Sequence, residues 1–171
     1  MASLDPTTKS PDTASTQALR VLVVDADEAD RQDIVLQLGA AWPFERELLV
    51  EFADDGHSAL KKLAAARFSL IVLDWKSPEM SGGDVLRTIR SGGARTPAVV
   101  LSSLRRHEIL DDIEALGTAF VNKAELTTIT LHEAIASSLR MLGRANLTDT
   151  TSIHPKDSSK LSPQETRPSA Q

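Results

Sequence analysis

The chain has no cysteine, so neither disulfide bonds nor thiolate chemistry can contribute to its structure or function. Aromatic residues make up only 4% of the 171 residues, which means that aliphatic side chains must form most of the core. No apolar run approaches the roughly 20 residues of a membrane-spanning helix, and the N-terminus lacks the apolar stretch of a secretory signal. The expected class is therefore a soluble protein of the reducing cytoplasm, with no membrane insertion.

An excess of positive charge is also missing. The net charge is −5, with acidic and basic residues interspersed, so the sequence shows no general basic surface for direct binding of nucleic acid. Hydrophobic residues still make up 41% of the chain, which is enough for a folded core. We therefore expect one globular domain that does not bind nucleic acid directly.

Two terminal stretches differ in composition from the rest of the chain. Residues 1–18 and 145–171 are rich in Ser, Thr, Pro, Asp and Lys. Because such segments bury too little apolar surface to offset the entropy lost on ordering, we expect disordered tails around one folded unit at 19–144. The C-terminal tail is too short for an output domain, which favours a stand-alone unit.

Within that unit, five short apolar runs alternate with segments in which apolar residues recur at helical spacing. The runs lie at residues 21–24, 48–52, 70–73, 98–101 and 119–121. Four of them are continuous rather than alternating, as expected of strands that helices cover on both faces. Five βα units in strict alternation predict an α/β protein with a doubly wound, five-stranded parallel sheet.

Polar residues end four of the apolar runs. Asp25, Asp74 and Ser102 directly follow the first, third and fourth runs, and Lys123 follows the fifth closely. In open α/β sheets, ligands bind outside the carboxyl ends of the strands, so these side chains are expected at one edge. The set suits phosphoryl transfer, because a carboxylate can attack phosphorus while a divalent cation and a lysine stabilise the phosphoryl oxygens.

The chain resembles the receiver domain of two-component response regulators. The resemblance covers about residues 20–144 and is carried by the segments VLVVDADEADR, LIVLDWKSPEMSGGDVLRTIR, TPAVVLSS and GTAFVNKAEL. Its most specific part places Pro78 four residues and Gly82 eight residues after Asp74. The resemblance implies a flavodoxin-like receiver fold with the strand order 2-1-3-4-5.

The resemblance also implies roles for individual residues. Asp74 matches the aspartate that accepts the phosphoryl group, and Lys123 matches the lysine that pairs with the phosphate. Ser102 matches the switch hydroxyl that turns toward the phosphoryl group. Phe120 occupies the aromatic position whose rotamer changes on activation.

The implied magnesium site departs from the family pattern. Its ligands would be Asp25, Asp74 and the backbone carbonyl of Lys76, but the second acidic position of the usual pair is Ala26. Because such sites depend on a few anionic ligands, the loss of one carboxylate is expected to weaken magnesium binding. Asp27 stands where the first helix begins, and an N-cap role is the favoured interpretation. A further hypothesis is that the Lys76 ammonium supplies part of the missing positive charge.

Three functions are therefore considered. The first is a single-domain response regulator that accepts a phosphoryl group from a histidine kinase or phosphotransfer protein and then binds a target protein. It would be a signalling switch that catalyses only its own phosphorylation and dephosphorylation. The second is a degenerate receiver that binds proteins without phosphate, which Ala26 favours. The third is a nucleotide-binding or hydrolytic enzyme on the same architecture. The sequence argues against it, because it contains neither a glycine-rich phosphate loop after the first strand nor a nucleophile elbow.

Overall fold

The computed structural model describes residues 18–42 and 47–148 of the chain. In chain order, the elements are β1 (Leu19–Val24), α1 (Glu28–Ala41), β2 (Leu48–Ala53), α2 (Gly56–Ala65), β3 (Leu70–Asp74), α3 (Gly82–Ser91), β4 (Ala98–Ser102), the 3-10 turn η1 (Arg106–Glu108), α4 (Leu110–Leu116), β5 (Ala119–Asn122), the 3-10 turn η2 (Lys123–Glu125) and α5 (Thr128–Thr148). The five strands form one parallel sheet in the order β2-β1-β3-β4-β5, as expected. None of the helices within the described ranges is long and apolar enough to cross a membrane.

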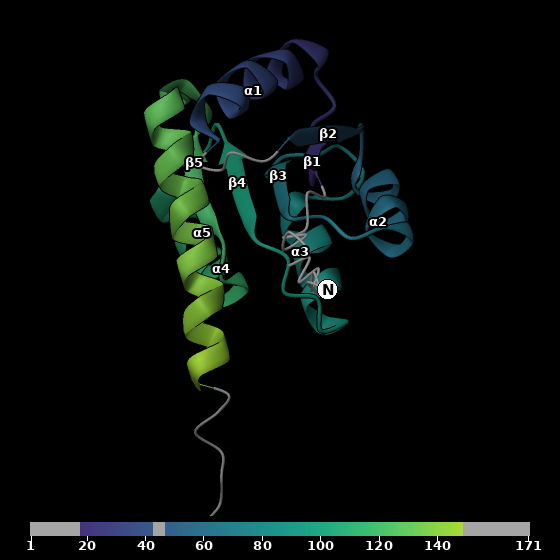
Figure 1. The fold of residues 1–171 in the computed structure, drawn as a ribbon, viewed down its shortest axis with the longest axis vertical. Helices are drawn as coiled ribbons and strands as arrows, with labels where there is room; N and C mark the ends of the chain where they lie inside the picture. Colours follow the sequence, from purple (N-terminus) through teal and green to yellow (C-terminus); the bar gives the residue numbers. More distant parts are fainter. Residues whose placement is uncertain (1–17, 43–46, 149–171) are drawn as a thin grey trace, which may run out of the picture.

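Alternate residues of the strands face opposite sides of the sheet, and helices cover both sides. Val21 and Val23 of β1 face α1 and α5, where they pack with Ile34, Leu38, Leu131 and Ile135. Leu22 and Val24 face the other layer, where they pack with Ala59, Val85, Leu86 and Ile113 of α2, α3 and α4. Figure 1 shows α5 on one side of the strands and α2 on the other. The continuous apolar runs in the sequence result from this double coverage.

Local capping interactions set where the helices begin and end. The Asp27 carboxylate accepts hydrogen bonds from the backbone N–H groups of Ala29 and Asp30, which makes it the N-cap of α1. Ser81 caps α3 in the same manner, through the N–H of Asp84. Gly117 ends α4 with a φ of 58°, a left-handed conformation that glycine adopts without steric cost. The expected N-cap role of Asp27 is therefore confirmed.

The end of the fold lies further along the chain than expected. Helix α5 continues through Thr148, so residues 145–148 extend this helix rather than begin the C-terminal tail. A helix that is already formed adds each further residue at little cost, and no proline interrupts this segment. The remaining residues of both expected tails, 1–17 and 149–171, lie outside the described residues.

Candidate functional site

The strand register brings Asp25 and Asp74 together at the carboxyl edge of the sheet. Val24 of β1 lies beside Leu73 of β3, so the next residue of each strand emerges at the same level. The two side chains differ in exposure, because that of Asp25 is 2% exposed and that of Asp74 is 15% exposed. Two strands that are far apart in sequence thus place two carboxylates in one small, mostly covered space.

Both carboxylates use one oxygen to bind the turn that follows them. Asp25 Oδ1 accepts a hydrogen bond of 2.9 Å from the N–H of Asp27, and Asp74 Oδ1 accepts one of 3.0 Å from the N–H of Lys76. An aspartate that accepts from the backbone two residues ahead holds its own side chain in a defined orientation. The remaining oxygen, Oδ2, of each carboxylate therefore faces the fifth strand.

Lys123, at the start of η2, occupies the space between these Oδ2 atoms. Its Nζ donates to Asp25 Oδ2 at 2.7 Å and to Asp74 Oδ2 at 3.0 Å, and it also donates to Asp30 Oδ2 at 2.7 Å. Burial of the ammonium acts to lower the pKa of Lys123, but the three carboxylates outweigh this effect. They raise the pKa well above its ordinary value of 10.5, so Lys123 stays charged at every physiological pH.

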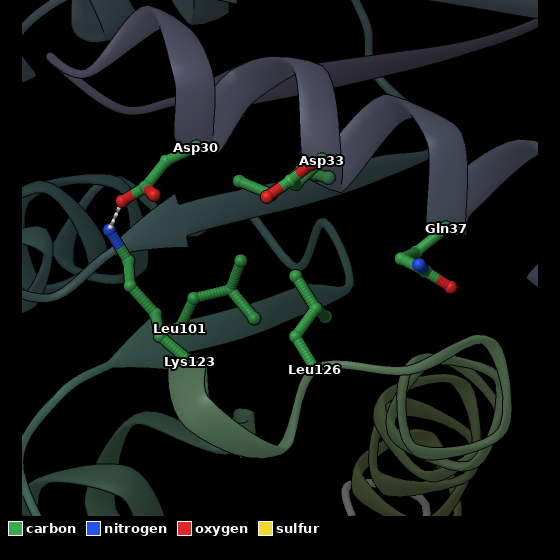
Figure 2. Close-up of a pocket in the computed structure, with 7 residues that line it drawn as sticks. Asp30, Asp33, Gln37, Leu101, Lys123 and Leu126 are labelled. Atoms are coloured by element: carbon green, nitrogen blue, oxygen red, sulfur yellow. Dashed lines mark hydrogen bonds and ion pairs between the residues drawn. The ribbon is translucent and has the colours of Figure 1, made fainter.

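Asp30 is a member of this site that the sequence analysis missed. It lies in the first turn of α1, and its side chain is 44% exposed. Figure 2 shows the Asp30 carboxylate pointing at the end of the Lys123 side chain, at the border of a cavity of about 190 Å³. No local pattern in the sequence marked Asp30, because its contact with Lys123 joins residues 93 positions apart.

Ser102 and Phe120 lie on the neighbouring strands β4 and β5. The Ser102 side chain is fully buried, and its Oγ accepts a hydrogen bond of 3.1 Å from the N–H of Leu104. The main chain of β4 runs beside that of β3, with Trp75 N–H donating to Leu101 O. Phe120 is half-buried and packs against the core under α3 and α4. All expected site residues except Phe120 thus stand at or just past strand ends.

Lys76 contributes to the site through its main chain. Its amide holds Asp74 Oδ1, whereas its side chain is exposed to solvent. The loop returns to the sheet at Gly82, whose N–H donates to Trp75 O. A Cβ atom on residue 82 would stand 2.5 Å from the carbonyl oxygen of Asp74.

The donor set fits a magnesium ion, which prefers hard oxygen ligands such as the carboxylates of Asp25 and Asp74. Within residues 18–42 and 47–148, no three His, Cys, Asp or Glu side chains form a ready-made metal centre. The carboxylates close instead on the ammonium of Lys123. A divalent cation would therefore compete with Lys123 for the same oxygens. Asp27 does not complete the set, because its carboxylate caps α1.

The fold and the site define a flavodoxin-like α/β domain whose acidic strand edge suits phosphoryl chemistry. The family model of the response regulator receiver domain matches residues 21–136. The chain belongs to this family, as the resemblance in its motifs implied.

Individual relatives agree with this assignment. The response regulator MprA of Mycobacterium ulcerans is 31% identical over 132 residues, which are 77% of this chain and 53% of that protein. A protein-glutamate methylesterase/protein-glutamine glutaminase of Treponema denticola is 30% identical over 141 residues, 77% of this chain and 37% of that protein. The chain thus spans about half or less of the length of these relatives.

The match covers almost the full length of two solved structures of similar fold. The chemotaxis protein CheY4 of Vibrio cholerae is 30% identical, with a TM-score of 0.57, and the match covers 75% of this chain and 98% of that one. A CheY-like receiver domain protein of Methanospirillum hungatei is 22% identical, with a TM-score of 0.62 and coverage of 75% and 99%. The second likeness supports the fold alone.

Proposed function

We propose that the chain is a single-domain response regulator that accepts a phosphoryl group on Asp74 from a histidine kinase or a phosphotransfer protein. The observation that carries this proposal is the pairing of Asp74 Oδ2 with the Lys123 ammonium at 3.0 Å, at the strand edge of a receiver-family fold. The proposed location is the cytoplasm, which the lack of cysteine favours.

The proposed reaction begins with an attack of a carboxylate oxygen of Asp74 on phosphorus. The bond from phosphorus to the donor's leaving atom breaks, and the leaving group keeps the electron pair; a basic leaving group such as a histidine nitrogen takes up a proton from solvent. An acyl phosphate forms on Asp74. Lys123 offsets negative charge on the phosphoryl oxygens as they approach the carboxylates. A bound magnesium ion, held by Asp25, Asp74 and the carbonyl of Lys76, would supply further positive charge to those oxygens.

The proposed output is a change in the surface formed by α4, β5 and α5. In the structure, the Ser102 hydroxyl accepts a hydrogen bond of 3.1 Å from the Leu104 N–H. The phosphoryl group would draw the hydroxyl away from this N–H. Movement of the segment after Ser102 would then change the space available to the Phe120 side chain on β5, and with it the rotamer of Phe120. Phosphorylation shifts the population between these two loop arrangements, and a separate target protein binds one of them preferentially.

The test is labelling by a small phosphodonor. The full chain is incubated with acetyl phosphate and magnesium, and the acyl phosphate is detected by intact mass. We expect label in the parent and in Asp111→Asn, which changes an exposed aspartate of α4, but none in Asp74→Asn. Equal labelling of Asp74→Asn and the parent would contradict the proposed acceptor.

The alternative is a receiver that binds its target without phosphate. Ala26 favours it, because the site lacks one acidic position of the family pattern. The bonds of Lys123 to Asp25 and Asp30 also favour it, because they must be given up before the ammonium can contact a phosphate. Absence of label at saturating magnesium would select this alternative. The methylesterase activity in the name of the Treponema denticola relative is not proposed, because the match covers only 37% of that protein.

A further inference from the structure

We propose that Asp30 is the third acidic ligand of the magnesium site and replaces the carboxylate that Ala26 lacks. This inference rests on the proposed function, since it concerns the cation that assists phosphorylation of Asp74. Four residues make up the site, and they come together only in the folded chain. They are Asp25 after β1, Asp30 on α1, Asp74 at the end of β3 and Lys123 after β5.

The geometry of α1 directs Asp30 toward the strand edge. Helical side chains tilt toward the helix N-terminus, and α1 begins at Glu28, four residues after β1 ends at Val24. Asp30 in the first turn therefore leans back toward the position beside residue 26. A carboxylate in the first turn of the helix can thus reach the same space as a carboxylate in the preceding loop.

The contacts confirm that Asp30 reaches the site. Its Oδ2 atom lies 2.7 Å from Lys123 Nζ, the same distance as that of Asp25 Oδ2. Three carboxylates therefore face one ammonium, which offsets only one of their negative charges. A divalent cation that joined Asp25, Asp30 and Asp74 would offset two of these charges instead of one. It would also release the Lys123 ammonium to contact a phosphoryl oxygen.

The neighbouring acidic residues do not fill this position. Asp27 is held by the N–H groups at the start of α1, and Asp54 pairs with Arg31 at 2.8 Å. Asp33 lies one turn further along α1 and lines the same cavity (Figure 2). The ion pairs of Lys123 are instead with Asp25, Asp30 and Asp74. Asp30 is also free to adjust, because 44% of its side chain is exposed.

The test is direct binding of magnesium to the full chain without a phosphodonor. Titration calorimetry at constant ionic strength compares the parent with Asp30→Asn and with Asp33→Asn, a matched control on the same helix. We expect Asp30→Asn to weaken magnesium binding by about tenfold or more, and Asp33→Asn to leave it unchanged. Adding Ala26→Asp to Asp30→Asn should restore binding, which separates loss of a ligand from damage to the fold.

Three results would overturn the inference: a parent that binds no magnesium, equal affinity in Asp30→Asn and the parent, or equal weakening in Asp33→Asn. The labelling experiment on Asp74 is read separately. Failure of labelling in the parent overturns the proposed function, whereas the calorimetric result reports on the metal ligands alone.

Discussion

Gly82 lies directly against the main-chain carbonyl of Asp74, with no room for a side chain between them. A Cβ atom on residue 82 would stand 2.5 Å from Asp74 O and 3.0 Å from the Leu73 side chain. The oxygen belongs to the backbone of a central strand and cannot move aside without shifting β3. Glycine at this position is therefore a condition for the orientation of the Asp74 carboxylate.

We predict that Gly82→Ala lowers the free energy of unfolding by about 1–3 kcal/mol, because overpacking displaces the β3 backbone. It should also slow labelling of Asp74. Denaturant unfolding checks the first effect, and acetyl phosphate labelling checks the second. The control is Gly39→Ala in α1, where a Cβ would meet nothing within 4 Å. Alanine is the better helix former, so this control should be neutral or stabilising by up to about 1 kcal/mol. Equal stability of the two variants would contradict the close approach.

A second prediction concerns the exposed side chain of Lys76. Its amide hydrogen bond to Asp74 Oδ1 is retained in Lys76→Ala, so this change removes only the ammonium. If that charge assists the site, labelling should slow by about two- to fivefold, the effect of roughly 0.5–1 kcal/mol from an exposed charge. Labelling rates are measured across a magnesium titration. The idea fails if both proteins label equally and with the same dependence on magnesium.

A third prediction separates phosphorylation from its structural consequence. Ser102→Ala should still be labelled on Asp74. The Ser102 hydroxyl contacts neither of the Asp74 carboxylate oxygens, which bind the Lys76 amide and the Lys123 ammonium. It should lose the phosphorylation-dependent change in amide hydrogen exchange over residues 103–109. Ser102→Thr keeps a hydroxyl and should retain the change. A full exchange response in Ser102→Ala would exclude the proposed switch role.

A fourth prediction concerns the pH dependence of stability that arises from the ion pair between Arg20 on β1 and Glu51 on β2. The Arg20 side chain donates to the Glu51 carboxylate and, against the opposing effect of desolvation, lowers the pKa of that group below its ordinary value of 4.5. A lowered pKa means that the ionised form is favoured by folding. The stabilisation is present above about pH 4.5 and is lost as the pH falls through the lower, folded-state value.

The parent should therefore lose its advantage over Glu51→Gln as the pH falls from 7 to 3. The advantage at pH 7 is expected to stay below about 1 kcal/mol, because the Glu51 and Arg20 side chains are 31% and 38% exposed. Urea unfolding of both proteins at several pH values measures the difference. A difference that stays constant across this range would show that the ion pair does not contribute.

The sequence predicted the architecture because burial on both faces leaves a direct pattern in the residues. Continuous aliphatic runs such as 70–73 marked the strands, and the polar residues at or just after the ends of four runs marked the functional edge. The N-cap role of Asp27 followed from local chemistry, since capping depends on residues only two or three positions away. Composition did not show how far α5 continues, and the helix runs through Thr148 into the stretch that was expected to be a tail.

The sequence by itself determined the family, the sheet and the positions of Asp25, Asp74, Ser102 and Lys123 along its edge. Those features depend on periodicity and on the neighbours of each residue. Only the tertiary structure decided that Asp30 joins the site, because its contact with Lys123 links residues 93 positions apart. Such a contact requires α1 and the segment after β5 to pack at one edge of the sheet. No local pattern records that packing, so the third carboxylate became visible only in the folded chain.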